Sequence, residues 1–299
     1  MKNFFSRIVG KIIIITKPYP LVFGFLKYFY RKIETARDWW WPAKLPKENC
    51  FPSQYIVTND KWTRANWDYL NRGYADEPYI KDAIAKVRDY TMVMHDGLLV
   101  NYDIASYLVR ANIEGAFVET GVWRGGAAAM MAIAALRQGK PRKFHLFDSF
   151  VGLPNPCEAE YEDWMEPQWG YQKKDANGLM VASGFLATEQ HYSEKVMFDI
   201  VGYPREMVEF HVGWFQDTVP VAKSSIGSIA LLRLDGDLYE STLVCLRNLF
   251  PLVVKGGFVV IDDYGFKGCR MACDEYFAEM KIYPYMHHID GISKYFIKP

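Results

Sequence analysis

The chain has 299 residues, of which 50% are hydrophobic and 23% are charged, and its 35 basic residues equal its 35 acidic ones. This composition is typical of a globular protein with one large domain or two small ones. Residues 1–33 carry seven basic residues and no acidic residue, so the rest of the chain is acidic. An acidic body argues against nucleic acid as the main partner.

The basic segment 1–33 is also rich in apolar residues. Its uncharged runs, 12–16 and 18–26, are much shorter than the ~20 residues of a spanning helix, and no secretory cleavage site is evident. On a helix over about residues 3–16 the apolar side chains form one stripe, as in helices that lie in a membrane interface. An arm that packs on the domain or on a second subunit of a homo-oligomer is the alternative. We expect a cytoplasmic protein, peripheral at the inner membrane face if the segment is an interfacial helix.

The five cysteines show no CxxC pattern and no cluster with histidine. Cys269 and Cys273 have helical spacing, but the sequence offers no third metal ligand near them. We expect buried thiols, and an odd, unpatterned count suits a reducing compartment. The others are Cys50, Cys157 and Cys245.

Three regions follow one another along the chain: a basic extension (1–50), a helical cap (51–112) and a catalytic domain (113–299). In the last, apolar strand patterns alternate with helical ones. The predicted strands are 115–120, 143–150, 207–214, 228–235 and 257–263, and the predicted helices are 127–139, about 186–200, 242–257 and 269–281. Two further strands, about 284–290 and 293–297, flank Asp290-Gly291 as in a hairpin. The fold class is therefore α/β, a doubly wound, mostly parallel Rossmann-like sheet with an antiparallel C-terminal edge hairpin.

The stretch VETGVWRGGAA, residues 118–128, joins a predicted strand to a predicted helix. Gly121, Gly125 and Gly126 allow a tight turn into the helix, but the spacing is not the GxGxxG of dinucleotide-binding proteins. Glu119 closes the strand and would repel a phosphate. The turn therefore favours a ligand with an ammonium group or hydroxyls, and a plain strand-to-helix turn is the alternative.

Two later strand ends add candidate ligand contacts. Asp148 ends the second strand, where an acidic residue typically bridges the ribose hydroxyls of a bound nucleoside or dinucleotide. A helix cap is the alternative at that position. After the third strand, Trp214 and Phe215 either flank an adenine or belong to the core.

Carboxylates cluster after the fourth and fifth strands, in LLRLDGDLYES (231–241) and GGFVVIDDYG (256–265). Asp235 ends one strand, and Asp262 and Asp263 end the next, which a right-handed crossover can place beside it. Such a cluster is costly unless a metal ion or a cationic ligand lies within it. Oxygen ligands alone suit Mg²⁺, with Mn²⁺ or Ca²⁺ as alternatives. Capping and surface solvation would explain the acids without an ion.

Five separated motifs together carry a family resemblance that runs from about residue 90 to the end. They are VETGVWRGGA, LFDSFVGLP, GWFQDTVP, LRLDGDLYESTLVCL and GGFVVIDDYG followed by GCRMACDEY. In this order they resemble the macrocin O-methyltransferase family, whose members methylate the sugars of glycosylated antibiotics.

The resemblance implies S-adenosylmethionine as methyl donor and Mg²⁺ as metal. The donor would contact Glu119, Thr120, Gly121, Val122, Asp148, Ser149, Gly213, Trp214 and Phe215. The metal would be held by Asp235, Asp262 and Asp263, and Asp237 matches an acid proposed as the base in some members. Other members are thought to use a histidine, for which His191 and His211 are candidates here.

The acceptor implied is a sugar-containing small molecule or a glycan, and the basic N-terminus hints at a glycan made at a membrane. The loop 155–185 matches the family poorly, so it does not indicate which acceptor is used. Two rival functions remain at this point. An NAD-dependent dehydrogenase would explain the glycine turn and Asp148 but not the later acids. A non-catalytic membrane-associated scaffold would have no need for clustered carboxylates.

Overall fold

A computed structural model describes residues 76–154, 182, 184 and 186–299, which belong to one compact unit. The predicted interfacial helix or arm, the extension 1–50 and most of the loop 155–185 lie outside these residues. Within the described part of the chain, none of the helices has both the length and the apolar composition that crossing a bilayer requires.

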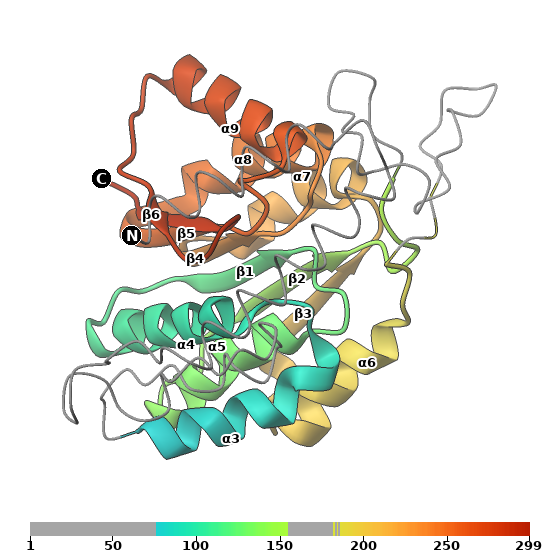
Figure 1. Cartoon of the computed structure of the whole chain (residues 1–299), viewed down its shortest axis with the longest axis vertical. Helices are drawn as coiled ribbons and strands as arrows, with labels where there is room; N and C mark the ends of the chain where they lie inside the picture. The colour runs from blue at the N-terminus through green and yellow to red at the C-terminus, as the bar shows by residue number, and fades with distance from the viewer. Residues whose placement is uncertain (1–75, 155–181, 183, 185) are drawn as a thin grey trace, which may run out of the picture. The chain divides into compact units, whose positions relative to one another are not determined.

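Seven strands form one sheet in the order β3-β2-β1-β4-β5-β7-β6 (Figure 1). Neighbours among β1 to β5 pair in parallel, and β7 runs antiparallel to both β5 and β6. This arrangement confirms the predicted sheet and its C-terminal edge hairpin. The strands are β1 (Ala116–Thr120), β2 (Phe144–Asp148), β3 (Val208–Val212), β4 (Ile229–Leu234), β5 (Val253–Ile261), β6 (His287–His288) and β7 (Lys294–Ile297).

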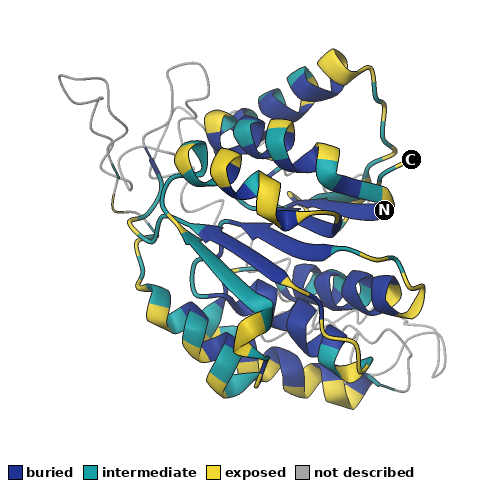
Figure 2. Ribbon diagram, turned by 180° about the vertical axis from the view of Figure 1, so that it is seen from behind, coloured by how far each residue is buried: buried dark blue, intermediate teal, exposed yellow. Residues whose placement is uncertain are grey.

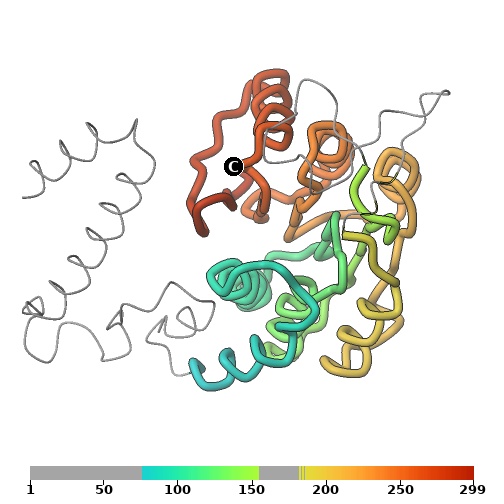
Figure 3. Tube along the Cα trace, turned by 45° about the vertical axis from the view of Figure 1, so that its right-hand side comes forward, coloured from blue at the N-terminus to red at the C-terminus, as the bar shows by residue number. Residues whose placement is uncertain are grey.

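Helices cover both faces of the sheet (Figures 1 and 3). On one side lie α3 (Glu77–Val87), α4 (His95–Arg110), α5 (Gly126–Arg137) and α6 (Gln190–Glu194), which continues into a π-helical segment, Lys195–Ile200. On the other side lie α7 (Phe215–Ile226), α8 (Tyr239–Leu249) and α9 (Lys267–Met280). Because α3 and α4 share a hydrophobic cluster with the sheet, residues 76–112, the described part of the predicted cap, belong to this first layer.

The burial pattern explains why these segments became strands. All six residues of β4 are buried, as expected for a central parallel strand covered on both faces. Alternate residues of β4 face opposite sides of the sheet, each covered by a hydrophobic cluster. Leu231 packs in the cluster beneath α4 and α5, and Leu232 packs in the cluster beneath α7 to α9. Strand β3 lies at the sheet edge and is only half buried (Figure 2).

Two elements differ from the sequence prediction. No helix was predicted between the third and fourth strands, where α7 begins at Phe215 and contains Pro220. Strand β5 begins at Val253, inside the segment predicted as helix 242–257; α8 ends at Leu249, next to Pro251. Proline is unfavourable inside a helix, yet α7 contains Pro220, whereas α8 ends two residues before Pro251. Cys245, Cys269 and Cys273 are buried free thiols, as predicted.

Gly121, directly after β1, leaves no room for a side chain beside the end of β4. Its φ is +88°, and a Cβ atom there would lie 1.6 Å from the carbonyl oxygen of Asp235. The backbone of the turn therefore lies directly against the end of β4, which is possible only without a side chain.

We predict that Gly121→Ala lowers the free energy of unfolding by about 3 kcal/mol or more, since strain at positive φ and overpacking add. Gly139→Ala is the matched control, because φ is +68° there but no atom would lie within 4 Å of an added Cβ. It should cost only the conformational strain, about 1–2 kcal/mol. Urea denaturation of both variants measures the difference, and equal losses would contradict the close approach.

Candidate active site

The candidate site lies where the chain reverses its direction of winding across the sheet. From β1 the chain adds β2 and β3 on one side, whereas β4 and β5 lie on the other. Ligands of open α/β sheets bind beyond the carboxyl ends of the strands at such a switch point. Glu119, Asp235 and Asp262 all lie at or next to these ends of β1, β4 and β5.

Two adjoining cavities open at this edge and share Gly121, Asp235 and Asp237. The first is lined by Asp148 and Ser149 and by the aromatic residues Trp214 and Phe215. The second is lined by Glu119, Val122, Asp262 and Asp263, and by residues 90–94, Ile292 and Ser293. Most residues predicted to bind donor or metal therefore line one of two neighbouring cavities.

The remaining two predicted donor contacts, Thr120 and Gly213, line neither cavity. Thr120 is buried in β1. The Gly213 amide donates to the carbonyl oxygen of Asp148 at 3.0 Å, so it ties the end of β3 to the end of β2. In the described structure both residues support the site through the backbone, and their contact with a donor stays a prediction.

The carboxylate of Asp148 organises the glycine turn. Its Oδ2 accepts hydrogen bonds from the amides of Val122 at 2.8 Å and Trp123 at 2.7 Å, and its Oδ1 accepts one from the Phe150 amide at 2.7 Å. Burial raises the pKa of Asp148, and the three amides oppose that rise. Asp148, which is predicted to bind a ribose, therefore also holds the glycine turn next to the predicted ribose position.

Arg233, the penultimate residue of β4, lies among the carboxylates at the strand ends. Its side chain is fully buried, Nη1 contacts Glu119 Oε1 at 2.7 Å and Asp235 Oδ2 at 2.6 Å, and Nη2 contacts Asp262 Oδ1 at 2.7 Å. One guanidinium therefore joins the ends of β1, β4 and β5. A buried guanidinium requires such partners, and the carboxylates require a positive charge in return.

The carboxyl groups at these strand ends outnumber the single guanidinium of Arg233. Burial raises the pKa of Glu119 to about 8 although Arg233 opposes it. Burial, together with the charges of Asp235 and Asp262, also raises the pKa of Asp237, and burial with the charge of Asp237 raises that of Asp263. A carboxyl group with a raised pKa is one for which an added cation is favourable.

Asp235, Asp237 and Asp263 form the group of carboxylates best placed for an ion. Each offers an oxygen, and these oxygens lie within 4.8 Å of one another. Asp262, which the sequence placed in the metal set, directs one oxygen to Arg233 instead. The structure thus adds Asp237 to the candidate ligands, while the assignment of Asp262 as a ligand and Asp237 as a base stays a prediction.

The two histidines considered as alternative bases lie away from this edge. His191, on α6, is exposed and pairs with Glu189 at 3.1 Å. His211, on β3, contacts His145 of β2. Neither lines either of the two cavities.

Sequence reasoning missed Arg233, although a signal was present. The strand SIALLRLD places one arginine inside an otherwise apolar central strand. A charged residue at such a position must find a buried counter-charge. The two strand-end acid clusters were the available partners, so the arginine was the first candidate for the positive charge between them.

Comparison with known proteins identifies the family. A profile described as macrocin O-methyltransferase (TylF) matches residues 34–298. The chain belongs to the macrocin O-methyltransferase family. Enzymes of this family transfer a methyl group from S-adenosylmethionine to an oxygen atom, so the protein is an O-methyltransferase, as predicted.

Characterised relatives from the family cover most of the chain. A tetracenomycin-related rhamnosyl 4'-O-methyltransferase of Streptomyces olivaceus is 35% identical over 68% of this chain and 76% of its own. Demethyldecarbamoylnovobiocin O-methyltransferase of Streptomyces niveus is 33% identical over 80% of this chain and 87% of its own. The structure of the O-methyltransferase NovP is similar with a TM-score of 0.57, at 35% identity, covering 70% of this chain and 82% of that one.

We predict that Arg233→Met lowers the free energy of unfolding of this protein by about 3–5 kcal/mol, because it leaves buried carboxylates without their counter-ion. Without the arginine, the carboxyl pKa values in the folded state rise further above those of the unfolded chain. The folded variant therefore binds more protons, so it should be more stable at about pH 6 than at about pH 8, and more pH-sensitive than the native protein.

Urea denaturation at both pH values tests this, with Arg247→Met as the control. Arg247 also pairs with two carboxylates, Glu275 at 3.0 Å and Glu279 at 2.7 Å, but its side chain is 47% exposed. Its loss should cost far less and show no such pH dependence. Equal losses of unfolding free energy in the two variants would show that the buried ion pairs of Arg233 contribute no more to stability than the exposed pairs of Arg247.

Proposed function

We propose that the protein is an S-adenosylmethionine- and Mg²⁺-dependent O-methyltransferase that acts on a sugar hydroxyl of a glycosylated natural product or glycan. The observation that carries the proposal is the excess of carboxylates around Arg233, beside a cavity lined by the predicted nucleoside contacts. The relatives support the acceptor class, since their names specify a rhamnosyl tetracenomycin derivative and a novobiocin precursor.

The donor set fits a magnesium ion. The candidate ligands are carboxylate oxygens alone, which hard divalent cations prefer, and the carboxyl pKa values are raised in a way that an added cation would reverse. Asp235 and Asp263 belong to the set in both assignments, with Asp262 or Asp237 as the third. When bound, such an ion lowers the pKa of a coordinated hydroxyl and orients it.

Asp237 has the position expected of a general base. It lines both the cavity with the predicted nucleoside contacts and the cavity with the candidate metal ligands, so it lies where a hydroxyl and the donor methyl group would meet. Its backbone has φ of +56°, and its amide donates to Asp263 Oδ2 at 3.0 Å. Because a residue other than glycine is uncommon in this conformation, the local fold holds the side chain at the junction at some cost in strain.

The other residues bind and orient the reactants. Asp148 and Ser149 would contact the donor ribose, and Trp214 and Phe215 would lie against its adenine. Glu119, buried and paired with Arg233, would face the donor's polar end or a neighbouring hydroxyl. The donor supplies an activated methyl group when bound, so the chain's main contribution is to position the hydroxyl, which is worth up to ~7–11 kcal/mol of barrier.

The proposal predicts methyl transfer to glycosylated acceptors that stops when divalent metal is removed. The test incubates the protein with S-adenosylmethionine and a panel of deoxysugar-bearing antibiotics and nucleotide sugars, with mass spectrometry to detect gain of a methyl group. EDTA should abolish product formation, and added Mg²⁺ should restore it. Full activity in EDTA would refute the metal's role, and binding of NAD in place of S-adenosylmethionine by calorimetry would refute the donor.

We further predict that Asp237→Asn lowers kcat by roughly 10²–10⁴-fold, the usual contribution of a general base. Asparagine tolerates positive φ well, so the backbone should be kept. If Asp237 is the base, the Mg²⁺ concentration needed for half-maximal activity stays the same. If that concentration rises instead and excess Mg²⁺ restores kcat, Asp237 is a metal ligand and not the base.

A further inference from the structure

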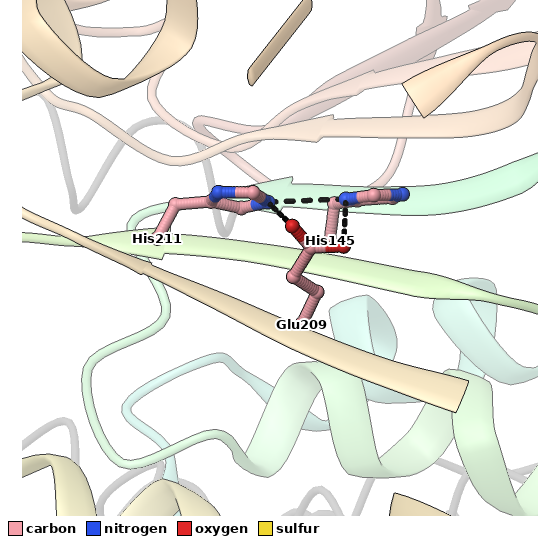
Figure 4. A group of neighbouring side chains, drawn as sticks. All are labelled: His145, Glu209 and His211. Atoms are coloured by element: carbon pink, nitrogen blue, oxygen red, sulfur yellow. Dashed lines mark hydrogen bonds and ion pairs between the residues drawn. The ribbon is translucent and has the colours of Figure 1, made fainter. Parts of the chain in front are cut away.

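A second group of ligating side chains lies apart from the acidic site, on the other half of the sheet. His145 on β2 and Glu209 and His211 on β3 project from the same face (Figure 4). The strand register explains this, because Glu209 is paired with His145, and His211, two residues on, is paired with Phe147. Phe147 belongs to the core beneath α7, so the three side chains lie on that side of the sheet.

The side chains converge on one point. His145 Nδ1 lies 3.0 Å from His211 Nε2, Glu209 Oε2 lies 3.7 Å from His145 Nδ1, and Glu209 Oε1 lies 3.9 Å from His211 Nε2. Figure 4 shows both imidazoles turning a ring nitrogen towards the other and towards the carboxylate. One hydrogen shared between the rings satisfies the nitrogen pair in this arrangement.

Packing alone does not account for this group. His145 is fully buried, and its Nε2 has no hydrogen-bond partner among the described residues. An unsatisfied buried polar atom costs free energy that an apolar side chain would avoid. His211 and Glu209 are 12% and 42% exposed, so the group is closed on one side and reachable from the sheet edge on the other.

The chemistry of the group favours a metal ion over an anion. Imidazole nitrogens and carboxylate oxygens are the usual ligands of zinc-type ions, whereas the carboxylate of Glu209 would repel an anion. Lys143 opposes a cation, since its Nζ lies 3.1 Å from Glu209 Oε2, but its side chain is 47% exposed and is free to turn into solvent.

We propose that His145 Nδ1, His211 Nε2 and a carboxylate oxygen of Glu209 bind a divalent transition-metal ion of the zinc type. Adjacent ligand atoms around a tetrahedral zinc ion with bonds of about 2.0–2.2 Å lie roughly 3.3–3.6 Å apart. The three observed separations lie on either side of this range, so small side-chain movements suffice. Two imidazoles and a carboxylate select zinc, cobalt or nickel over magnesium, which separates this site chemically from the all-oxygen one.

The ion would link the edge strand β3 to β2 through coordination bonds. This link would lie close to the strand ends that form the cavity predicted to bind the donor. The ring of His211 stacks on Phe147 at 4.2 Å between centroids, and Phe147 directly precedes Asp148. Water would complete the coordination on the exposed side. The role is structural, since the group lines neither cavity of the candidate active site.

Cobalt(II) titration of the full chain tests the proposal, because four-coordinate cobalt absorbs visible light far more strongly than hydrated cobalt. Excess Mg²⁺ is present throughout to occupy the acidic site. The native protein should bind one equivalent with the four-coordinate spectrum, zinc should displace it, and zinc should raise the Tm. His211→Gln and Glu209→Gln, at partly exposed positions, should each lose at least the roughly 10–100-fold in affinity that even an outer-shell change costs a metal site.

The matched control is His191→Gln, which removes an exposed histidine that also pairs with a glutamate. It should bind cobalt as the native protein does. Circular dichroism establishes that each variant is folded, so a loss of binding reports on the ligands. Absence of the four-coordinate spectrum in the native protein, or its persistence in both His211→Gln and Glu209→Gln, would overturn the proposal.

Discussion

The contact between one buried guanidinium and three strand-end carboxylates is the interaction on which the site depends. Arg233 lies near the end of β4 and contacts Glu119, Asp235 and Asp262, so it links three neighbouring strands at their carboxyl ends. Removing either side of this interaction would leave a buried charge without a partner, which costs far more than the intact network contributes. The arginine thus makes an acidic pocket compatible with a folded protein.

The carboxylates at this site differ in their contacts with Arg233. Glu119 and Asp262 are paired with Arg233, and Asp235 both contacts Arg233 and lies close to Asp237 and Asp263. Burial and neighbouring carboxylates raise the pKa values of Asp237 and Asp263. With Asp235, these two form the group best placed for a cation. The fixed charge of Arg233 therefore stabilises the carboxylates that it contacts in the folded protein. A bound metal ion and the cationic methyl donor would add positive charge at this site during catalysis.

Much of the fold and the location of the site follow from the sequence. Strand alternation predicted the sheet and its C-terminal hairpin, and the motif order predicted the family, because both depend on local pattern. Contacts between distant segments were harder to predict. The pairing of Arg233 with Glu119, 114 residues apart in the chain, and the meeting of His145 with Glu209 depend on which strands are neighbours. Helix α7 was not predicted, and it holds Pro220 in its interior.

The most direct test is a crystal structure of the protein with S-adenosylhomocysteine and Mn²⁺, in which anomalous scattering locates the metal. The account predicts one strong peak bonded to carboxylate oxygens of Asp235 and Asp263, with the nucleoside beside Asp148 and Trp214. Arg233 should still contact Glu119 and Asp262. The absence of a peak among these carboxylates while the nucleoside is bound would show that Arg233 alone neutralises these acids, and it would contradict the proposed role of the ion.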